Sequence, residues 1–157
     1  KAGEQGKKVS IVVSDSPFSE VGREFAKKLL KNNVDLQFYP VAALRQALKT
    51  VDFIILNAEA ITNNKIITEM GGELIAELAS KSKIPFFVVS HSWKKQDDLS
   101  LDYLKTSIKN SLKGAHSFFH YSFEQVSPSL VSGVISERGT HNHSVFVELV
   151  ERDKNKM

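Results

Sequence analysis

Four short polar clusters each follow a run of apolar residues, and they carry the side chains best suited to chemistry. They are residues 14–16 (SDS), 57–59 (NAE), 90–92 (SHS) and 136–138 (SER). In an open parallel sheet, ligands bind beyond the carboxyl ends of the strands, where such clusters meet. One carboxylate or hydroxyl from each cluster would form a small polar cleft. The sequence therefore predicts a ligand cleft at one edge of a sheet.

The second cluster opens a longer stretch, NAEAITNNKIITEMGG, at residues 57–72. An acid follows an apolar run, a polar loop comes next, and two glycines open an amphipathic segment. Backbone N–H groups at such a helix start favour a phosphate, although Glu69, just before the glycines, repels an anion. The candidate ligand-binding residues are Ser16, Glu59, Asn63, Asn64, Thr68, Gly71 and Gly72.

The elements that would position these residues follow from the hydrophobic pattern. Runs rich in β-branched residues predict strands at 9–15, 34–39, 51–57 and 84–90. Apolar residues three or four apart predict helices at 19–32, 41–49 and 70–81, with Ser19 as an N-cap. The inward residues are expected to be Val21, Phe25, Leu29 and Leu30 in the first helix and Leu74, Ile75 and Leu78 in the third. Alternating strands and helices indicate an α/β fold with a mainly parallel sheet.

The pattern is less regular after residue 92. A helix is predicted at 101–112, and residues 116–126 fit either a strand or an extended loop. A helical turn after Pro128 and a strand near 133–136 follow, and a final helix is predicted at 144–152. We find no repeat or interdomain linker, so we predict a single domain over residues 1–157.

Composition is typical of a soluble globular protein, with 41% hydrophobic and 25% charged residues. The absence of cysteine excludes disulfides and thiol chemistry within the chain and is typical of a protein of the reducing cytoplasm. The charged start of the chain indicates no signal peptide. No apolar run is long enough to span a membrane.

Other functional classes lack support. The net charge of +3 comes from Lys and Arg that are spread over helix faces, so we do not expect nucleic-acid binding. Dinucleotide, Walker and nucleophile-elbow motifs are absent. We interpret the histidines as polar loop residues and predict neither a metal nor another cofactor. The histidines considered as metal ligands are His116, His120, His141 and His143.

Three segments in the same order resemble one family. They are VVSDSPFSEVGREFAKKL, then NAEAITNNKIITEMGGELIAELASKSKIPFFVVSHSWK, and finally VSPSLVSGVISERG. Together they are similar to the C-terminal domain of the translation initiation factor 2B alpha/beta/delta family, which also includes methylthioribose-1-phosphate and ribose-1,5-bisphosphate isomerases. The resemblance implies a Rossmann-like three-layer domain that often mediates dimerisation. It also implies that the family's N-terminal helical domain is absent from this chain.

The chain departs from the isomerases where they bind phosphate and move protons. The resemblance implies a phosphate-binding arginine at the position of Ser16 and a catalytic aspartate at the position of Glu59. A lysine that would meet phosphate is replaced by Glu69. The isomerases' catalytic cysteine belongs to a motif upstream of this chain. We therefore expect a vestigial cleft that lacks positive charge, with no catalytic residues.

The leading functional hypothesis is a non-catalytic relative of the initiation factor 2B subunits that acts through protein–protein association. The resemblance implies self-association or binding to related 2B subunits, and contact with initiation factor 2 as a further option. The alternative is a sugar-phosphate isomerase-like enzyme or a sensor of phosphorylated metabolites or nucleotides. A third option, a purely structural domain with an unused cleft, stays open.

Overall fold

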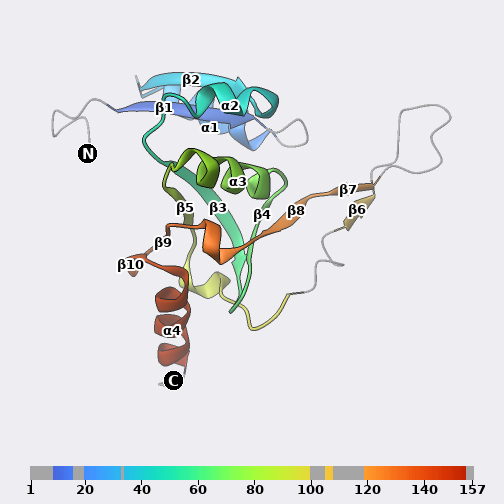
Figure 1. The fold of residues 1–157 in the computed structure, drawn as a ribbon, viewed down its shortest axis with the longest axis vertical. Coiled ribbons are helices and arrows are strands. Elements are labelled where there is room, and N and C mark those ends of the chain that lie inside the picture. Colours follow the sequence, from blue (N-terminus) through green and yellow to red (C-terminus); the bar gives the residue numbers. More distant parts are fainter. Residues whose placement is uncertain (1–8, 16–19, 33, 100–104, 108–118, 155–157) are drawn as a thin grey trace. The chain divides into compact units, whose positions relative to one another are not determined.

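The computed structural model describes residues 9–15, 20–32, 34–99, 105–107 and 119–154 (Figure 1). The chain divides into two compact units, Lys1–Val51 and Asp52–Met157. Both units combine strands with helices, which confirms the predicted α/β class. The expectation that residues 1–157 make a single domain stays a prediction.

In the first unit, a helix joins two parallel strands: β1 (Ser10–Asp15), α1 (Val21–Leu30) and β2 (Asp35–Pro40). Ser10 lies opposite Asp35, and the pairing continues to the ends of both strands. A single turn, η2 (Val41–Ala43), and the short helix α2 (Leu44–Ala47) follow, where the sequence predicted one helix at 41–49. This βαβ arrangement confirms the predicted parallel pair.

The inward face of α1 is narrower than predicted. Ala26 is buried, whereas Val21, Phe25 and Leu30 are exposed. Two strands spaced about 5 Å apart offer a narrow surface, so only a thin stripe of the helix is covered. The helix begins after Glu20 without a side-chain cap, and the predicted cap, Ser19, lies outside the described residues.

A six-stranded sheet forms the centre of the second unit, in the order β10-β9-β5-β3-β4-β8 (Figure 1). Its strands are β3 (Ile54–Ile61), β4 (Ile66–Glu69), β5 (Phe86–Val89), β8 (Phe123–Val126), β9 (Gly133–Ser136) and β10 (Gly139–His141). The neighbours β3, β5 and β9 are parallel, as predicted. The strands β4, β8 and β10 pair antiparallel with their neighbours. The sequence predicted neither β4 nor β10 and left β8 open between a strand and a loop.

The polar loop predicted after Glu59 is instead a tight hairpin followed by a buried strand. Strand β3 continues to Ile61, which lies opposite Ile66 of β4. Thr62 closes the turn: its N–H donates to the Lys65 carbonyl at 2.9 Å, and its hydroxyl accepts from the Lys65 N–H at 3.1 Å. An Asn-Asn pair between two β-branched runs is the signal in the sequence for this hairpin.

Helix α3 (Gly72–Ser82) packs against the sheet through its small residues. Ala76 and Ala79 are buried in one core cluster with Phe86 and Val88 of β5. Leu74, predicted to face inward, is instead 51% exposed. The buried residues Gly72, Ala76 and Ala79 recur at helical spacing, and Leu74, two residues before Ala76, lies on the opposite side of the helix. None of the described helices has the length and apolar character that spanning a membrane requires.

The region after residue 92 differs partly from the prediction. In the predicted helix at 101–112, the described residues form a strand, β6 (Lys105–Ser107), which pairs with β7 (Phe119–Tyr121). The residues predicted to form the inward face of that helix, Leu101, Leu104 and Ile108, lie outside the described residues. The choice left open for 116–126 is decided in favour of strands, β7 and β8. The turn at η5 (Pro128–Leu130) and the strand β9 are confirmed.

The predicted final helix is confirmed as α4 (His143–Lys154), and its first residue is a buried histidine rather than a polar loop residue. His143 Nε2 lies 2.9 Å from the Thr62 carbonyl oxygen, which links α4 to the β3–β4 turn. Asn142 caps the helix, because its side-chain oxygen accepts from the Val145 N–H at 2.9 Å. Burial lowers the pKa of His143, and the bond to Thr62 opposes this in part. The neutral ring with a proton on Nε2 fits the site.

We predict that His143 makes the fold sensitive to acid. Its pKa is lower in the folded chain than the ordinary value of 6.5, so the unfolded chain binds the proton more readily. The contribution of neutral His143 to the free energy of unfolding is fully present above about pH 6.5. It is lost as pH falls through the pKa of His143 in the folded chain. Urea unfolding between pH 7.5 and 5 should show a flatter stability profile for His143→Gln than for the wild type. His141→Gln, at the partly exposed neighbour, should keep the wild-type profile; two identical profiles for His143→Gln and wild type would contradict this role.

A second prediction concerns Lys83, the residue that ends α3. It has φ 57° and ψ 32°, a left-handed conformation that favours glycine. We expect Lys83→Gly to raise the free energy of unfolding by about 0.5–1 kcal/mol, since the relief of strain exceeds the extra entropy that glycine gives the unfolded chain. The control is Lys81→Gly inside the last helical turn, where glycine should cost up to about 1 kcal/mol. Destabilisation by both changes, measured by urea titration, would refute the prediction.

Candidate functional site

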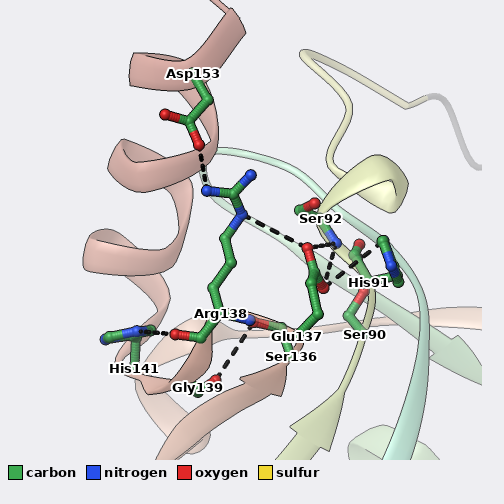
Figure 2. A network of polar contacts seen from close by, with 9 residues as sticks. All are labelled: Ser90, His91, Ser92, Ser136, Glu137, Arg138, Gly139, His141 and Asp153. Carbon is green, nitrogen blue, oxygen red and sulfur yellow. Dashed lines mark hydrogen bonds and ion pairs between the residues drawn. The ribbon is translucent and has the colours of Figure 1, made fainter.

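Polar clusters from three neighbouring parallel strands meet at their carboxyl ends, as the sequence predicted. They are residues 57–59, 90–92 and 136–138, at the ends of the paired regions of β3, β5 and β9. Both carboxylate oxygens of Glu137 accept from the Ser92 N–H at 3.2 Å, and Glu137 Oε2 lies 3.7 Å from His91 Nδ1 (Figure 2). The fourth predicted cluster belongs to the first unit, and its candidate residue Ser16 lies outside the described residues.

Glu137 connects several groups at the carboxyl edge of the sheet. Arg138 Nε lies 3.5 Å from Glu137 Oε1, and the same guanidinium pairs with Asp153 of α4 (Figure 2). Burial alone would raise the pKa of Glu137, but hydrogen bonds from Ser92 and from the backbone, with help from His91, lower it below its usual value. The carboxylate is therefore ionised and is engaged with groups of its own chain.

Glu59 sits at an irregularity of β3. The pairing with β4 shifts register between Ala58 and Ala60, so Glu59 is the residue of a β-bulge. Bulges re-aim a side chain out of the regular alternation and are frequent beside binding sites. Asn57 donates a hydrogen bond to the Glu59 carboxylate from its side-chain amide. The Glu59 carboxylate, a predicted ligand-binding group, is thus held by a hydrogen bond from its own strand.

The sequence predicted a cleft without positive charge, but a lysine lies beside Glu59. Lys94 Nζ donates to the Ala58 carbonyl at 3.1 Å and lies 3.5 Å from Glu59 Oε2. Lys94 belongs to the turn η3 (Ser92–Lys94), which follows β5. Because β3 and β5 are parallel neighbours, this turn comes to lie beside Glu59. The charge pattern gave no local sign of the pair, since the partners are 35 residues apart.

The residue after Lys94 anchors this turn. Lys95 has a fully buried side chain whose Nζ lies 2.9 Å from Asp97 and 2.7 Å from Glu151 of α4. Burial by itself lowers the pKa of Lys95, but the two charged hydrogen bonds outweigh it and raise the pKa above its ordinary value. The Gln96 N–H also donates to the Ile61 carbonyl at 2.8 Å. The turn is therefore fixed to both β3 and α4.

The predicted phosphate position at the start of α3 is occupied by a carboxylate of the chain itself. Strand β4 pairs with β8 so that Thr68 lies opposite Glu124. Both side chains then lie on the same face of the sheet, toward α3. Glu124 Oε1 accepts from the Glu73 N–H at 2.6 Å, and the amides of Gly71 and Gly72 also contribute hydrogen bonds. The side chain that satisfies this helix start comes from 51 residues away.

The fold requires glycine at positions 71 and 72 of this helix start for two different reasons. Gly71 has φ 102°, a conformation that residues with a side chain rarely adopt. A Cβ on Gly72 would lie 2.1 Å from the Thr68 hydroxyl, so the helix start rests directly on Thr68. The Thr68 side chain is buried and donates to the Glu69 carbonyl at 3.2 Å. Thr68, Gly71 and Gly72 are thus brought together, in a closely packed contact.

The remaining candidates lie apart from Glu59. Asn63 and Asn64 are exposed at the tip of the β3–β4 hairpin. Four residues of extended strand correspond to about 13 Å, so they do not flank the Glu59 carboxylate. Among the described residues, no group of three or more His, Asp or Glu side chains is arranged to hold a metal ion. The described candidates therefore form three separate places: the Glu59–Lys94 pair, the α3 start and the hairpin tip.

Comparisons with known proteins give one consistent family. The sequence profile of the Initiation factor 2 subunit family matches residues 1–143. The chain is 28% identical over 95 residues to the ribose 1,5-bisphosphate isomerase of Archaeoglobus fulgidus, covering 60% of this chain and 30% of that protein. It is 30% identical over 91 residues to the translation initiation factor eIF2B subunit alpha of Dictyostelium discoideum, covering 57% and 28%.

The fold agrees with this family. The structure of the translation initiation factor eIF-2B subunit delta from A. fulgidus matches with a TM-score of 0.80 at 18% identity, over 96% of this chain and 49% of that one. At this identity the match shows the fold alone, which is Rossmann-like. The chain spans less than half the length of each of these three proteins.

We predict that Glu124 stabilises the start of α3. Glu124→Ala leaves the helix amides without their acceptor and should lower the free energy of unfolding by about 1–2 kcal/mol. Glu124→Gln keeps an acceptor oxygen and should cost less. Burial has the largest effect and raises the pKa of Glu124, whereas the hydrogen bonds from the α3 amides lower it in part. The folded chain therefore binds this proton more readily, and the stability of the wild type relative to Glu124→Gln should fall as pH rises from about 4.5 through the raised pKa.

Urea unfolding of the wild type and both variants at pH 4.5 and 7 measures these effects. Glu77→Ala, an exposed change on the same helix, is the control. Wild-type stability in Glu124→Ala would show that the carboxylate does not cap the helix.

Proposed function

Since the chain belongs to the initiation factor 2 subunit family, we propose that it is a non-catalytic member that acts by associating with related subunits. The partners are a second copy of the chain or proteins related to the alpha, beta and delta subunits of eIF2B, and the association takes place in the cytoplasm. A dimer is the simplest such assembly. Contact with initiation factor 2 itself belongs to the same proposal.

The Glu124 carboxylate at the start of α3 carries this proposal. The amides of this helix start already have an anionic acceptor from the same chain. A phosphate at this position would meet Glu124, and Glu69 lies on the adjacent strand β4. The negative charges of a phosphate and of Glu124 at one helix start would repel each other. The helix macrodipole supplies only about half a positive charge there, which does not offset this repulsion. This supports a helix start used for packing rather than for a phosphorylated substrate.

The state of Glu59 supports the same proposal. A general base must lie within hydrogen-bond reach of the proton that it takes from a substrate. Here Asn57 donates to the Glu59 carboxylate, and the Lys94 ammonium lies beside it. Lys94 is in turn bound to the Ala58 carbonyl, so the pair is part of the local structure. These contacts fit a carboxylate that fixes η3 better than one that is free to move a proton.

A sugar-phosphate isomerase-like enzyme, or a sensor of phosphorylated metabolites or nucleotides, is the second candidate. Lys94 favours it, because a cation beside a carboxylate at the carboxyl edge of a parallel sheet is a suitable site for a small anionic ligand. The ribose 1,5-bisphosphate isomerase among the similar proteins favours it as well. This candidate requires Lys94 to exchange Glu59 for the ligand.

Two measurements on the same sample separate the candidates. Sedimentation at micromolar concentrations should show an assembly of the chain alone or with eIF2B-type alpha, beta or delta subunits. Thermal unfolding with up to millimolar ribose 1,5-bisphosphate or nucleotides should show no change in Tm. A rise of a few degrees that Lys94→Ala abolishes and the exposed control Glu77→Ala retains would favour the second candidate. A strictly monomeric chain that binds none of these subunits would overturn the first.

A further inference from the structure

Trp93 has the most exposed large apolar side chain among the residues that the structure describes. It is the only tryptophan of the chain, and 72% of it is accessible to solvent. It lies in η3, between Ser92 and Lys94, at the carboxyl edge of the sheet. Tryptophan is the residue type most often found to dominate the binding energy of protein interfaces. A ring this exposed is therefore a candidate anchor for a partner.

The turn that carries Trp93 is held on both sides. On one side, the Ser92 N–H donates to Glu137 (Figure 2). On the other, Lys94 binds the Ala58 carbonyl and Lys95 is buried against Glu151. The indole ring also lies 5.9 Å from the His91 ring, centroid to centroid. A fixed turn presents the ring without the entropic cost of ordering a loop on binding, which is a property of effective interface anchors.

The charges around this turn give the expected chemistry of the partner. Among the described residues that form ion pairs around η3, five are carboxylates and four are cations, and the two cations that follow Trp93 in the sequence, Lys94 and Lys95, are largely buried. Lys95 is fully buried, whereas 86% of the Asp97 side chain is exposed. The carboxylates are Glu59, Glu137, Asp97, Glu151 and Asp153, and the cations are Lys94, Lys95, Arg138 and Lys154. A basic surface therefore complements this edge, and the phosphates of a nucleic acid do not.

We propose that Trp93 anchors a basic surface of a partner protein, with an arginine or lysine of that partner over the indole ring. Cations bind tryptophan faces through the ring quadrupole, and arginine does so most often. The exposed carboxylates beside η3 pair with further basic groups of the partner. This inference rests on the proposed function, because it names the surface through which the association takes place.

The single tryptophan makes the proposal directly measurable. Hexa-arginine peptide is the probe, and it should quench or shift the Trp93 fluorescence of the full chain, with the effect weakening as salt rises. Hexa-glutamate should have no effect. With a labelled hexa-arginine peptide, Trp93→Ala should lower the affinity about fivefold or more, whereas the exposed control Leu74→Ala should leave it unchanged. Because Trp93 is exposed, the substitution should not affect folding, which its thermal unfolding curve checks. Equal affinities of Trp93→Ala and wild type would overturn the proposal.

A further measurement separates this inference from the proposed function. Acrylamide quenching of Trp93 is compared before and after the chain assembles with itself or with an eIF2B-type subunit. Protection of Trp93 in the assembly, together with competition by hexa-arginine, supports the inference. Assembly with unchanged quenching would overturn the inference and leave the proposed function standing. Binding of hexa-arginine through Trp93 without any assembly would overturn the proposed function and leave the basic-partner surface standing. Protection by a second copy without competition would show that the ring docks on an apolar surface, contrary to the proposal.

Discussion

The second unit depends on the double pairing of β3. The first half of this strand is the parallel neighbour of β5, and its second half forms an antiparallel hairpin with β4. The partner changes between Asn57 and Ala58, directly before Glu59, where the register of the β3–β4 pairing shifts. One half thereby builds the carboxyl edge with residues 90–92 and 136–138. The other half, through β4 and β8, builds the surface on which α3 begins.

At both of these sites, charged side chains of the chain itself form the hydrogen bonds and ion pairs. At the α3 start, Glu124 accepts from the helix amides, and at the carboxyl edge Lys94 lies beside Glu59. The buried Lys95 joins the turn after β5 to α4. A buried ion pair is weak evidence for stability because desolvation offsets its attraction, but removing one partner leaves an unpaired buried charge. Such pairs fix a geometry, and here the geometry is the position of η3.

This geometry connects the fold with the proposed association. The fold keeps the end of β3, Glu59 and the start of α3 in place, and groups of the same chain form their hydrogen bonds. Such a scaffold is suited to binding other proteins. The most exposed aromatic ring among the described residues lies on a turn fixed from two sides. The proposed function assigns the carboxyl edge, where many α/β proteins bind small molecules, to a protein partner.

The sequence by itself determined the class of fold, because each strand and helix that it predicted correctly carries its signal within a few residues. The β-branched runs and the apolar spacing in α3 and α4 are of this kind. It also determined that polar residues would gather where parallel strands end. Only the tertiary structure decided what these residues do. Glu124, Lys94 and His143 find partners that are 51, 35 and 81 residues away, and a register between strands sets such contacts, which no local pattern records. The same reason explains why Phe25 was wrongly predicted to face inward, since the width of the surface that covers α1 is a property of the folded unit.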